Sequence, residues 1–567
     1  MKRIIIIGGL SAGPSAAAKA RRYNENAEIL LFEKTANISY ATCGIPYALS
    51  GKIKDREDLM VVEANLLRER FNIDVRLNEE VLEVLPGQHK IRTGKGVYEY
   101  DKLVYAAGAG TFIPSIKNME LAGNWSACRT LEDFERIMKN GVVSDVKHIT
   151  IMGAGLIGVE VAENLKKIGK DVTLIEGNAQ VLPMWEKKFS RFAQFTLEEN
   201  GIQVITNTFV KEFEVESGLI RSIKINEEQS IQTDYVIMSV GIRPNTSLLT
   251  SRGAEHIDNG AVKVNEKMET SLPDIYAAGD CASIKNVQTG EYDYLPLGTH
   301  SNKGGRTAGV NAAGGNETFV GGYKTAIVKL FEKTMARTGM NPRFMKEKGI
   351  AFETNLIIAS STPGYYPNPK DLLIEIYYSP EEGTILGAEL FGEKGVDKRV
   401  DVLSTAIYAK LKVTDLPNLD LAYAPPFSPA KDPVVVSGYV SSNAHKSDYK
   451  EISVEKLQEI IENEDASAYT ILDVRTTGEI KQSGKIEGAV EINVNHLRDH
   501  LDQIDKEKPT YIYCAKGMRG YLAFLILQQN GFTQLANLSG GYTVWNMLNE
   551  KIDRSVFPDK MEAIELS

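Results

Sequence analysis

Cys43 combines a reactive side chain with a setting that favours reactivity. It stands in the segment SYATCGIPY (39–47), and the residue five positions later is Ala48, so no second thiol has the spacing to resolve a disulfide with it. Pro46 and the residues after it predict that Cys43 lies at or near a helix N-terminus, where the thiol pKa is lowered and the thiolate is favoured. We prefer this interpretation to a buried structural cysteine. We therefore expect Cys43 to act alone, by forming a mixed disulfide, a persulfide or a sulfenic acid.

A glycine-rich turn in the second hundred residues indicates a dinucleotide site. GAGLIG places Gly153, Gly155 and Gly158 between a predicted strand and a predicted helix, where glycines permit the tight turn and let a pyrophosphate approach the helix N-terminus. Glu176 closes the next strand and can accept hydrogen bonds from a ribose 2′-OH. Because neither of the two residues after Glu176 is Arg or Lys, nothing there would receive a 2′-phosphate, and the motif predicts NADH rather than NADPH.

A similar turn opens the chain. GGLSAG carries Gly8 and Gly13 but has Leu10 where the second glycine of the motif would stand. Glu33 lies 20 residues after Gly13, the spacing of a ribose-binding acid. Taken alone, this segment would also fit an ordinary buried strand-to-helix turn.

With AAGAG (106–110), VGIRPN (240–245) and YAAGD (276–280), these turns resemble the FAD- and NAD(P)-dependent pyridine nucleotide-disulfide reductases over roughly residues 1–440. The resemblance implies two cofactor sites, with the nicotinamide stacked on the flavin. FAD would be held by Gly8, Gly13, Glu33, Gly108 and Asp280, and NADH by Gly153, Gly155, Gly158, Glu176 and Gly241.

Single-cysteine members of that family divide into peroxide or oxygen reducers and coenzyme A-disulfide reductases. The first branch has a His in the first glycine loop, where this chain has Ser11. CGIPY (43–47), the tyrosine pair at 365–366 and YAPP (423–426) are similar to the second branch. That resemblance implies that Tyr423 and one of the pair, Tyr365 before Tyr366, reach the cysteine across a dimer interface, where a phenol can protonate a departing thiolate. The alternative is that these tyrosines only pack in a core or an interface.

One residue departs from the coenzyme A branch, because Thr42 stands where Asn is usual, which leaves the thiol substrate open. We expect Ser39 and Thr42 to border the substrate. The basic residues that could bind the phosphates of coenzyme A are Arg22, Arg68, Arg70, Lys303 and Arg306. Each of them could instead be a solvated surface charge. We expect Arg22, Lys303 and Arg306 to bind the substrate.

The C-terminal segments TILDVRTTGE (470–479), GKIEGAVEINV (484–494), YIYCAKGMRG (511–520) and LSGGYTVW (538–545) resemble a single rhodanese domain. Its specific element is the loop from Cys514 to Arg519, in which Gly517 allows a turn that points backbone N–H groups at the sulfur. The C-x4-R spacing is one residue shorter than that of the related cysteine phosphatases. We expect Cys514 to carry sulfane sulfur, with Arg519 adding charge or anchoring the loop, and Asp473 and Arg475 holding the loop's base.

The order of the strands and helices expected around these residues predicts an α/β chain of several domains. We expect two nested Rossmann-like domains for FAD (1–115 and 245–324) and NADH (116–244), then an α+β dimerisation domain (325–440). A polar linker (441–451) and an α/β rhodanese domain (452–567) would follow. A helix is expected at 15–22 and another near 399–409.

Composition and cysteine content limit the possible partners, metal sites and cellular location of the protein. The chain has 567 residues, a net charge of −10 and four widely separated cysteines, which argue against nucleic acid as the main partner and against a zinc site or a disulfide framework. The cysteine pattern leads us to expect a cytoplasmic protein without a metal site. Because no apolar run is long enough to span a bilayer, we expect no membrane association. The family resemblance implies a homodimer.

These features together predict an NADH-dependent flavoprotein reductase of coenzyme A-persulfide, coenzyme A-disulfide or polysulfide, with sulfane sulfur handled at Cys514. NADH would reduce FAD, and the flavin would pass electrons to the sulfur of Cys43. An NADH oxidase or peroxidase that cycles Cys43 through a sulfenic acid is the alternative enzyme. A redox-sensing or sulfur-carrier protein is the alternative outside enzymes.

Overall fold

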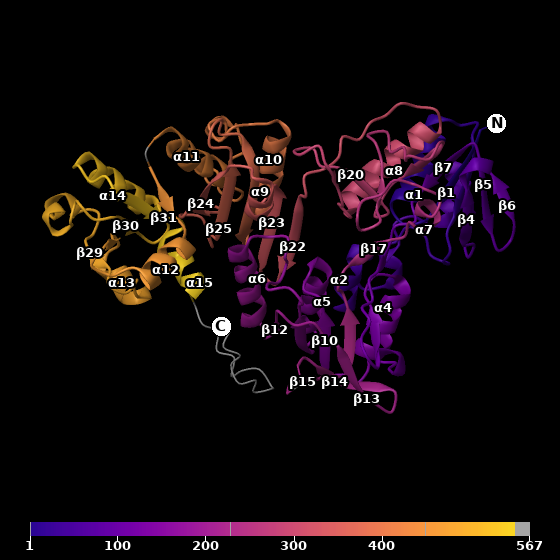
Figure 1. Cartoon of the computed structure of the whole chain (residues 1–567), viewed down its shortest axis with the longest axis horizontal. Helices are drawn as coiled ribbons and strands as arrows, with labels where there is room; N and C mark the ends of the chain where they lie inside the picture. The colour runs from indigo at the N-terminus through magenta and orange to yellow at the C-terminus, as the bar shows by residue number, and fades with distance from the viewer. Residues whose placement is uncertain (1, 227, 448, 550–567) are drawn as a thin grey trace. The chain divides into compact units, whose positions relative to one another are not determined.

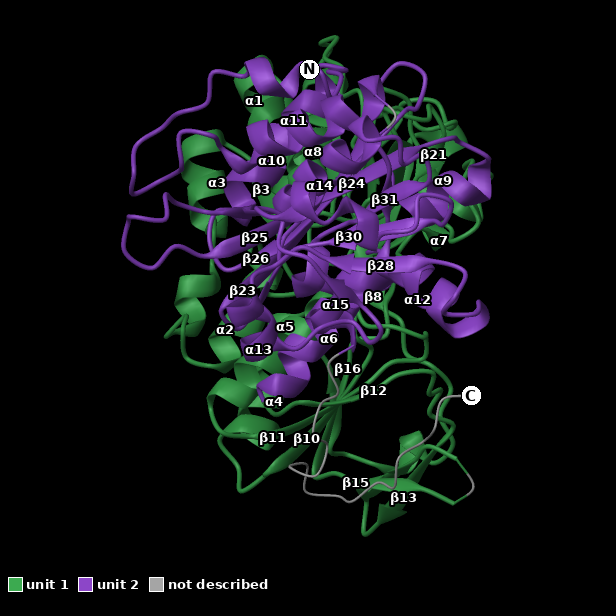
Figure 2. Ribbon diagram, turned by 90° about the vertical axis from the view of Figure 1, so that its left-hand side faces the viewer, with its two compact units in different colours: residues 1–182, 201–323 green, residues 183–200, 324–567 purple. Residues whose placement is uncertain are grey.

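The computed structural model describes residues 2–226, 228–447 and 449–549, and it forms two compact units (Figures 1 and 2). The first unit comprises residues 1–182 and 201–323, and the second comprises residues 183–200 and the chain from 324 onward. Residues 550–567, which we included in the rhodanese domain, lie outside the described residues. No helix in the described part of the chain is long and apolar enough to cross a membrane.

The N-terminal sheet of the first unit is parallel, and its central strand is buried on both faces. Ile4, Ile5 and Ile6 have no exposed surface, as expected of a strand covered on both faces. Its strands, in spatial order, are β19 (Ile275–Ala277), β7 (Lys102–Tyr105), β1 (Arg3–Ile7), β2 (Glu28–Phe32) and β3 (Asp74–Arg76). The last strand in sequence, β19, thus pairs with β7 across a long insertion.

That insertion contains a second parallel sheet built on the same plan. Its strands, in spatial order, are β12 (Gln203–Ile205), β11 (Asp171–Ile175), β10 (His148–Met152), β16 (Tyr235–Met238) and β9 (Trp125–Ala127). Helix α5 (Leu156–Lys167) links β10 to β11 as α1 (Ala12–Tyr23) links β1 to β2. The two nested Rossmann-like domains predicted from the glycine turns are confirmed.

Helix α1 starts at Ala12, before the predicted start at residue 15, because Pro14 fits the first turn of a helix. It packs closely on α8 (Gly298–Ala312). A Cβ on Gly305 would lie 2.4 Å from the Ala12 carbonyl oxygen, and one on Gly309 would lie 2.2 Å from that of Ala16. Only glycine permits this approach, which brings the polar residues of α8 to those of α1.

The second unit begins with an antiparallel sheet. Its strands, in spatial order, are β22 (Ala326–Leu330), β23 (Lys333–Gly339), β26 (Ile385–Gly392), β25 (Asp371–Tyr378) and β24 (Glu353–Ser360). Helices α10 (Val396–Tyr408) and α11 (Pro433–Lys446) pack on it, which confirms the expected α+β domain and the helix near 399–409.

Helix α6 (Lys187–Glu199) corrects one predicted boundary. We placed residues 183–200 in the NADH domain, but they pack on the antiparallel sheet of the second unit. Phe192 contacts Phe391 with ring centroids 5.4 Å apart, and Lys188 forms an ion pair with Glu375 at 2.5 Å. These partners lie far along the chain, so the segment could not be assigned from its local pattern.

The predicted linker at 441–451 is also wrong in its first half. Residues 441–446 complete helix α11, and β27 starts at Glu451. Ser441 and Ser442 are buried, and the Ser442 hydroxyl donates to the Val413 carbonyl oxygen at 3.1 Å. We took this serine-rich segment for a loop, whereas its small side chains pack against the domain.

A third parallel sheet completes the second unit and carries the predicted rhodanese domain (Figure 1). Its strands, in spatial order, are β27 (Glu451–Ile452), β31 (Leu535–Leu538), β30 (Thr510–Tyr513), β28 (Thr470–Asp473) and β29 (Val490–Glu491). Helices α12 (Val454–Asn463), α13 (Thr477–Ser483), α14 (Met518–Gln529) and α15 (Gly541–Asn549) belong to it. The four-part fold class predicted from the sequence is therefore confirmed.

Candidate active sites

Cys43 lies where the sequence places it, at the start of a helical segment. It is the middle residue of a 3-10 turn, η1 (Thr42–Gly44), which leads directly into α2 (Ile45–Leu49) with Pro46 in its first turn. Cys43 is exposed, unlike Cys128, Cys281 and Cys514. It is therefore the cysteine most open to an external sulfur compound.

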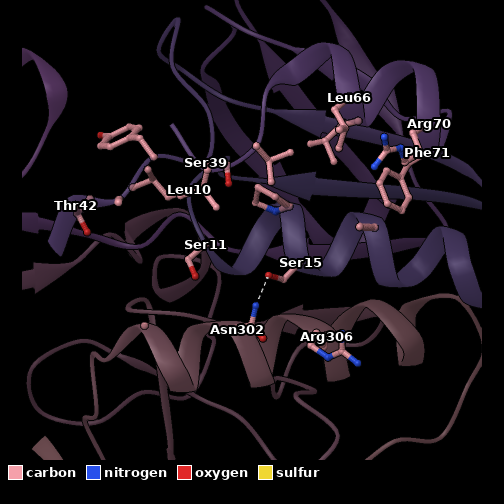
Figure 3. A pocket seen from close by; sticks show the side chains of 18 of the residues that line it. Leu10, Ser11, Ser15, Ser39, Thr42, Leu66, Arg70, Phe71, Asn302 and Arg306 are labelled. Atoms are coloured by element: carbon pink, nitrogen blue, oxygen red, sulfur yellow. Dashed lines mark hydrogen bonds between the residues drawn. The ribbon is translucent and has the colours of Figure 1, made fainter. Parts of the chain in front are cut away.

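A pocket of about 510 Å³ adjoins Cys43 (Figure 3). This volume lies in the ordinary range for small-molecule sites. Ser39 and Thr42 line it beside the cysteine, as do Ser11 and Leu10 of the first glycine loop. The departure from the glycine motif at Leu10 thus falls in the wall of the pocket.

Three guanidinium groups give the pocket its charge. Arg22 on α1, Arg70 on α3 (Ala64–Phe71) and Arg306 on α8 all line it, and none of the lining residues that the structure describes is acidic. Figure 3 shows Arg70 beside Phe71, and Arg306 on a different helix beside Asn302.

The other two predicted basic residues do not line the pocket. Lys303 is exposed on α8 and is not among the lining residues. Arg68 bonds to the Val75 carbonyl and to Asn65. Asn302, which no sequence motif marked, donates from its side chain to the Ser15 hydroxyl at 3.0 Å within the pocket wall.

The two glycine turns have the same stereochemistry. Gly8 and Gly153 have φ values of +106° and +99°, and a Cβ on either would collide with a backbone carbonyl of a neighbouring turn. A Cβ on Gly13 would lie 1.8 Å from the Gly8 oxygen, and one on Gly158 would lie 1.9 Å from the Gly153 oxygen. Such turns bring a helix N-terminus close to the strand end, where backbone N–H groups can bind a pyrophosphate.

The two acids predicted to bind ribose also occupy matching positions. Glu33 accepts a hydrogen bond from the Gly9 backbone N–H at 2.8 Å, and Glu176 accepts one from that of Ala154 at 2.7 Å. Each acid therefore faces the first residues of its own glycine loop. Glu176 also accepts from the backbone and side chain of Asn178, so a neutral amide is its polar neighbour.

Open space surrounds three other predicted cofactor-binding glycines. A Cβ on Gly108, Gly155 or Gly241 would meet no atom within 4 Å, as expected where a cofactor would fill the space. Asp280 follows β19 and forms a 2.8 Å ion pair with Arg129. These groups fit the FAD and nicotinamide sites that the sequence predicts.

A tyrosine and a carboxyl group near Cys43 went unrecognised in the sequence. Tyr47 donates from its hydroxyl to Glu160 Oε1 at 3.0 Å, which ties α2 to α5 of the nucleotide fold. Burial raises the pKa of Glu160 to about 7, although the hydrogen bond from Tyr47 opposes the shift. The two residues are 113 positions apart, so no local pattern could have revealed the pair.

The second unit brings together two of the predicted tyrosines. The hydroxyl groups of Tyr365 and Tyr423 are 3.2 Å apart, and this hydrogen bond raises the pKa of Tyr365. Both rings are largely exposed, at 74% and 51% of their surface. Tyr366 is more buried and has no part in this contact, so the geometry favours Tyr365 over Tyr366 as the partner of Tyr423.

Cys514 lies at the end of β30, where its loop turns into α14. The Gly517 backbone N–H donates to Cys514 Sγ at 3.1 Å, as the predicted turn requires. Gly517 has φ = +118° and provides the conformation that the turn needs. The Tyr542 N–H, from the first turn of α15, donates to the Cys514 carbonyl oxygen at 2.8 Å.

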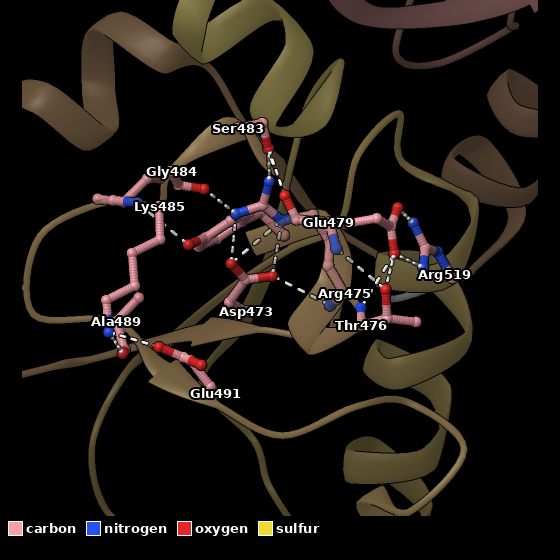
Figure 4. A network of polar contacts seen from close by, with 12 residues as sticks. Asp473, Arg475, Thr476, Glu479, Ser483, Gly484, Lys485, Ala489, Glu491 and Arg519 are labelled. Carbon is pink, nitrogen blue, oxygen red and sulfur yellow. Dashed lines mark hydrogen bonds and ion pairs between the residues drawn. The ribbon is translucent and has the colours of Figure 1, made fainter. Parts of the chain in front are cut away.

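Arg519 anchors the Cys514 loop through a carboxylate that the sequence analysis did not single out. It binds both oxygens of Glu479, at 2.7 and 2.5 Å, and this pairing lowers the pKa of Glu479 to about 2 (Figure 4). At the base of the loop, Arg475 and Asp473 form a buried ion pair at 2.6 Å. Arg475 also stacks on Tyr542, 4.1 Å from the ring centroid.

Comparison with protein families gives the class of protein that this fold and these sites define. Residues 2–293 match the pyridine nucleotide-disulphide oxidoreductase family, residues 325–433 match its dimerisation domain, and residues 453–548 match the rhodanese-like domain. The chain belongs to the pyridine nucleotide-disulphide oxidoreductase family, whose members use FAD and NAD(P)H.

Two curated relatives resemble the chain over about three quarters of its length. An NADH oxidase of Methanocaldococcus jannaschii is 33% identical over 76% of this chain and 97% of that protein. An NAD(P)H coenzyme A polysulfide/persulfide reductase of Pyrococcus horikoshii is 33% identical over 77% of this chain and 97% of that protein.

Two solved structures cover both the reductase part and the rhodanese part. Reduced CoADR-RHD of Bacillus anthracis superposes with a TM-score of 0.92 at 35% identity, covering 96% of this chain and 98% of that one. An NAD-dependent persulfide reductase of A. fulgidus superposes with a TM-score of 0.88 at 32% identity, covering 96% of this chain and 100% of that one.

Proposed function

We propose that this protein is an NADH-dependent flavoprotein that reduces coenzyme A-persulfide, coenzyme A-disulfide or polysulfide through Cys43, with a sulfurtransferase site at Cys514. The observation that carries the proposal is the pocket at Cys43, which joins an exposed thiol to three guanidinium groups without a carboxylate. Such a pocket suits a thiol whose distal end bears phosphates, and Arg22, Arg70 and Arg306 are the groups that would bind them. Ser39 and Thr42 would border the reacting end.

The residues that would hold the cofactors lie on the two nested folds. Gly8, Gly13, Glu33, Gly108 and Asp280 would bind FAD, and Gly153, Gly155, Gly158, Glu176 and Gly241 would bind NADH. The flavin supplies the route by which two electrons pass from NADH to sulfur. The chain itself orients both cofactors at the carboxyl ends of parallel strands, as in other doubly wound folds.

The chemistry at Cys43 follows from its lack of a partner thiol. The Cys43 thiolate would attack one sulfur of coenzyme A-disulfide, forming a mixed disulfide and releasing one coenzyme A thiolate. Two electrons from NADH then cleave the mixed disulfide, which releases the second thiolate and restores Cys43. With a persulfide, the same electron balance gives one coenzyme A thiol and one hydrogen sulfide for each NADH and proton consumed.

Tyr365 and Tyr423 would protonate the departing thiolate. Their hydroxyl groups bond to each other on an exposed surface of the domain that matches the family's dimerisation model. We propose a homodimer in which this pair approaches Cys43 of the partner subunit. The hydrogen bond between the two hydroxyl groups would let one phenol supply a proton to the sulfur while the other stabilises it.

The rhodanese part would receive sulfane sulfur on Cys514. The N–H of Gly517 stabilises a thiolate or persulfide there, and Arg519 holds the loop through Glu479. Sulfur loaded at this site would pass to coenzyme A, whose long pantetheine arm can reach between sites.

The test is a steady-state screen of NADH oxidation with coenzyme A-persulfide, coenzyme A-disulfide, polysulfide, oxygen and hydrogen peroxide as acceptors. The proposal predicts the highest kcat/KM with one of the sulfur compounds. Faster turnover of oxygen or peroxide would establish the NADH oxidase or peroxidase alternative, to which the Methanocaldococcus relative lends weight. Negligible turnover of every acceptor would favour a sensor or carrier.

A further inference from the structure

The hairpin formed by β24 and β25 of the dimerisation domain contacts the Cys514 loop by two separate routes. The first is a buried chain of hydrogen bonds that starts at Asn355 on β24 and ends at the Gly517 carbonyl. The second is an ion pair between Asp371, the first residue of β25, and Lys516 in the loop. Both routes lie within the second unit.

The buried route, which we call the anchor chain, consists of Asn355, Glu451, Tyr449 and Asn537. The Asn355 amide and the Tyr449 hydroxyl donate to the two oxygens of Glu451, at 3.0 and 2.9 Å. The Asn537 amide donates to the Tyr449 hydroxyl at 2.8 Å and to the Gly517 carbonyl oxygen at 3.2 Å. Asn355, Tyr449 and Asn537 are buried and Glu451 is half-buried, so water competes little with these bonds.

The Lys516–Asp371 ion pair has a different character. The ammonium and carboxylate are 2.6 Å apart, but both side chains are about half exposed, at 48% and 44%. An exposed pair of this kind adds little stability. Its effect is to restrict where Lys516, and the peptide bond that follows it, can lie.

These two contacts matter because they act on the peptide bonds on either side of Gly517. A Cβ on Gly517 would meet no atom within 4 Å, so no neighbouring group packs against that side of its Cα. Its N–H, which donates to Cys514 Sγ, belongs to the peptide shared with Lys516. Its carbonyl belongs to the next peptide and accepts from the Asn537 amide at 3.2 Å and from the Tyr521 N–H of α14 at 2.9 Å. The two routes therefore act together with the start of α14 to orient the Gly517 N–H toward the sulfur.

We infer that Asn355 and Asp371, on the dimerisation domain, are positioning residues for the sulfurtransferase site. They act through Tyr449 and Lys516 to hold the Gly517 N–H against Cys514. The inference rests on the proposed role of Cys514, and it makes the docked dimerisation domain part of that site. A thiolate that loses this N–H is less stable, so it forms only at higher pH.

Tyr449→Phe tests the buried route, because it removes one hydroxyl and leaves the ring in place. Tyr521→Phe is the matched control, since the Tyr521 ring packs on Tyr449 at a centroid distance of 4.9 Å but is not part of the anchor chain. Asp371→Asn tests the surface route with no risk to the core, and Asp371→Glu should rescue it. Reduction of coenzyme A-disulfide by NADH in the full-length protein serves as the folding control.

Two measurements read out the effect. One is the rate at which iodoacetamide alkylates Cys514 as a function of pH, followed on the Cys514 peptide. The other is sulfur transfer from thiosulfate to cyanide. We expect Tyr449→Phe to slow alkylation at neutral pH by up to about tenfold and to move the pH profile upward, because Asn537 loses its bond to Tyr449 and holds the peptides around Gly517 less firmly. Asp371→Asn should produce a smaller shift in the same direction.

The results separate the inference from the proposed function. If both variants kept the wild-type alkylation profile, or if Tyr521→Phe changed it as much as Tyr449→Phe, the positioning role would be overturned. If wild-type protein transferred no sulfur from thiosulfate while Tyr449→Phe still shifted the alkylation profile, the sulfurtransferase assignment would fail and the positioning role would stand.

Discussion

At the scale of single residues, we expect Glu176 to decide the choice of nicotinamide cofactor. It is buried, faces the Ala154 N–H of the glycine loop and has an asparagine amide as its polar neighbour. A carboxylate there repels a 2′-phosphate and accepts from a 2′-OH. We expect a higher kcat/KM for NADH than for NADPH, and about tenfold weaker discrimination in Glu176→Ala, measured in steady state. A preference of the wild-type protein for NADPH would contradict this role.

The phenol pair provides a second prediction at this scale. Tyr423→Phe should lower kcat about tenfold or more with little effect on folding, because only a hydroxyl is lost and general acid catalysis typically contributes at least that much. Tyr366→Phe is the matched control, since Tyr366 does not take part in the contact between Tyr365 and Tyr423. Equal kinetics for Tyr423→Phe and the wild type would leave Tyr423 a packing residue.

At the scale of elements, Tyr47 and Glu160 connect the helix behind Cys43 to the helix of the nucleotide fold. Burial lifts the pKa of Glu160 from 4.5 to about 7, so the folded state favours the protonated carboxyl. The unfolded carboxyl ionises at lower pH, so the folded protein loses stability as pH rises from about 4 to 7 and the penalty is complete above pH 7.

Glu160→Gln removes that penalty. We expect the variant to gain melting temperature relative to wild type at pH 8 and to show a smaller gain at pH 5.5. The difference is worth a few kcal/mol at most, since one pKa unit corresponds to about 1.4 kcal/mol. Glu120→Gln, at an exposed site, is the control and should behave alike at both values of pH. An equal gain for Glu160→Gln at both values would show that its carboxyl is not perturbed.

The elements also show what the sequence could and could not predict. The buried apolar strands that end in glycine turns were predictable from the sequence. The backbone at Gly8 and Gly153 tolerates no side chain, so glycine must stand there and marks the turn. The helical segment that begins just after Cys43 was predictable from Pro46. Helix α6 and the end of α11 were misassigned, because their environment comes from residues such as Phe391 and Val413, which are distant in sequence. The pairs of Tyr47 with Glu160 and of Arg519 with Glu479 depend on the fold for the same reason.

At the scale of the whole molecule, the rhodanese domain follows the dimerisation domain closely, since the first half of the polar linker that we expected at 441–451 belongs to a helix. Helix α11 continues to Lys446, and Glu451 bonds to Asn355 of the dimerisation domain soon afterwards. A covalent fusion raises the effective concentration of one site for the other. Because the rhodanese part is docked on the dimerisation domain within its unit, we expect sulfur loaded at Cys514 to leave on a small carrier such as the pantetheine arm.

The most direct test of the central claim, that sulfur is reduced at Cys43 alone, is anaerobic stopped-flow spectroscopy of the bound flavin in Cys43→Ser, with Cys514→Ser as the matched control. We expect NADH to reduce the flavin of both variants at nearly the wild-type rate. Soluble coenzyme A-disulfide or coenzyme A-persulfide should then reoxidise Cys514→Ser but not Cys43→Ser. Rapid reoxidation of Cys43→Ser by either compound would contradict the account.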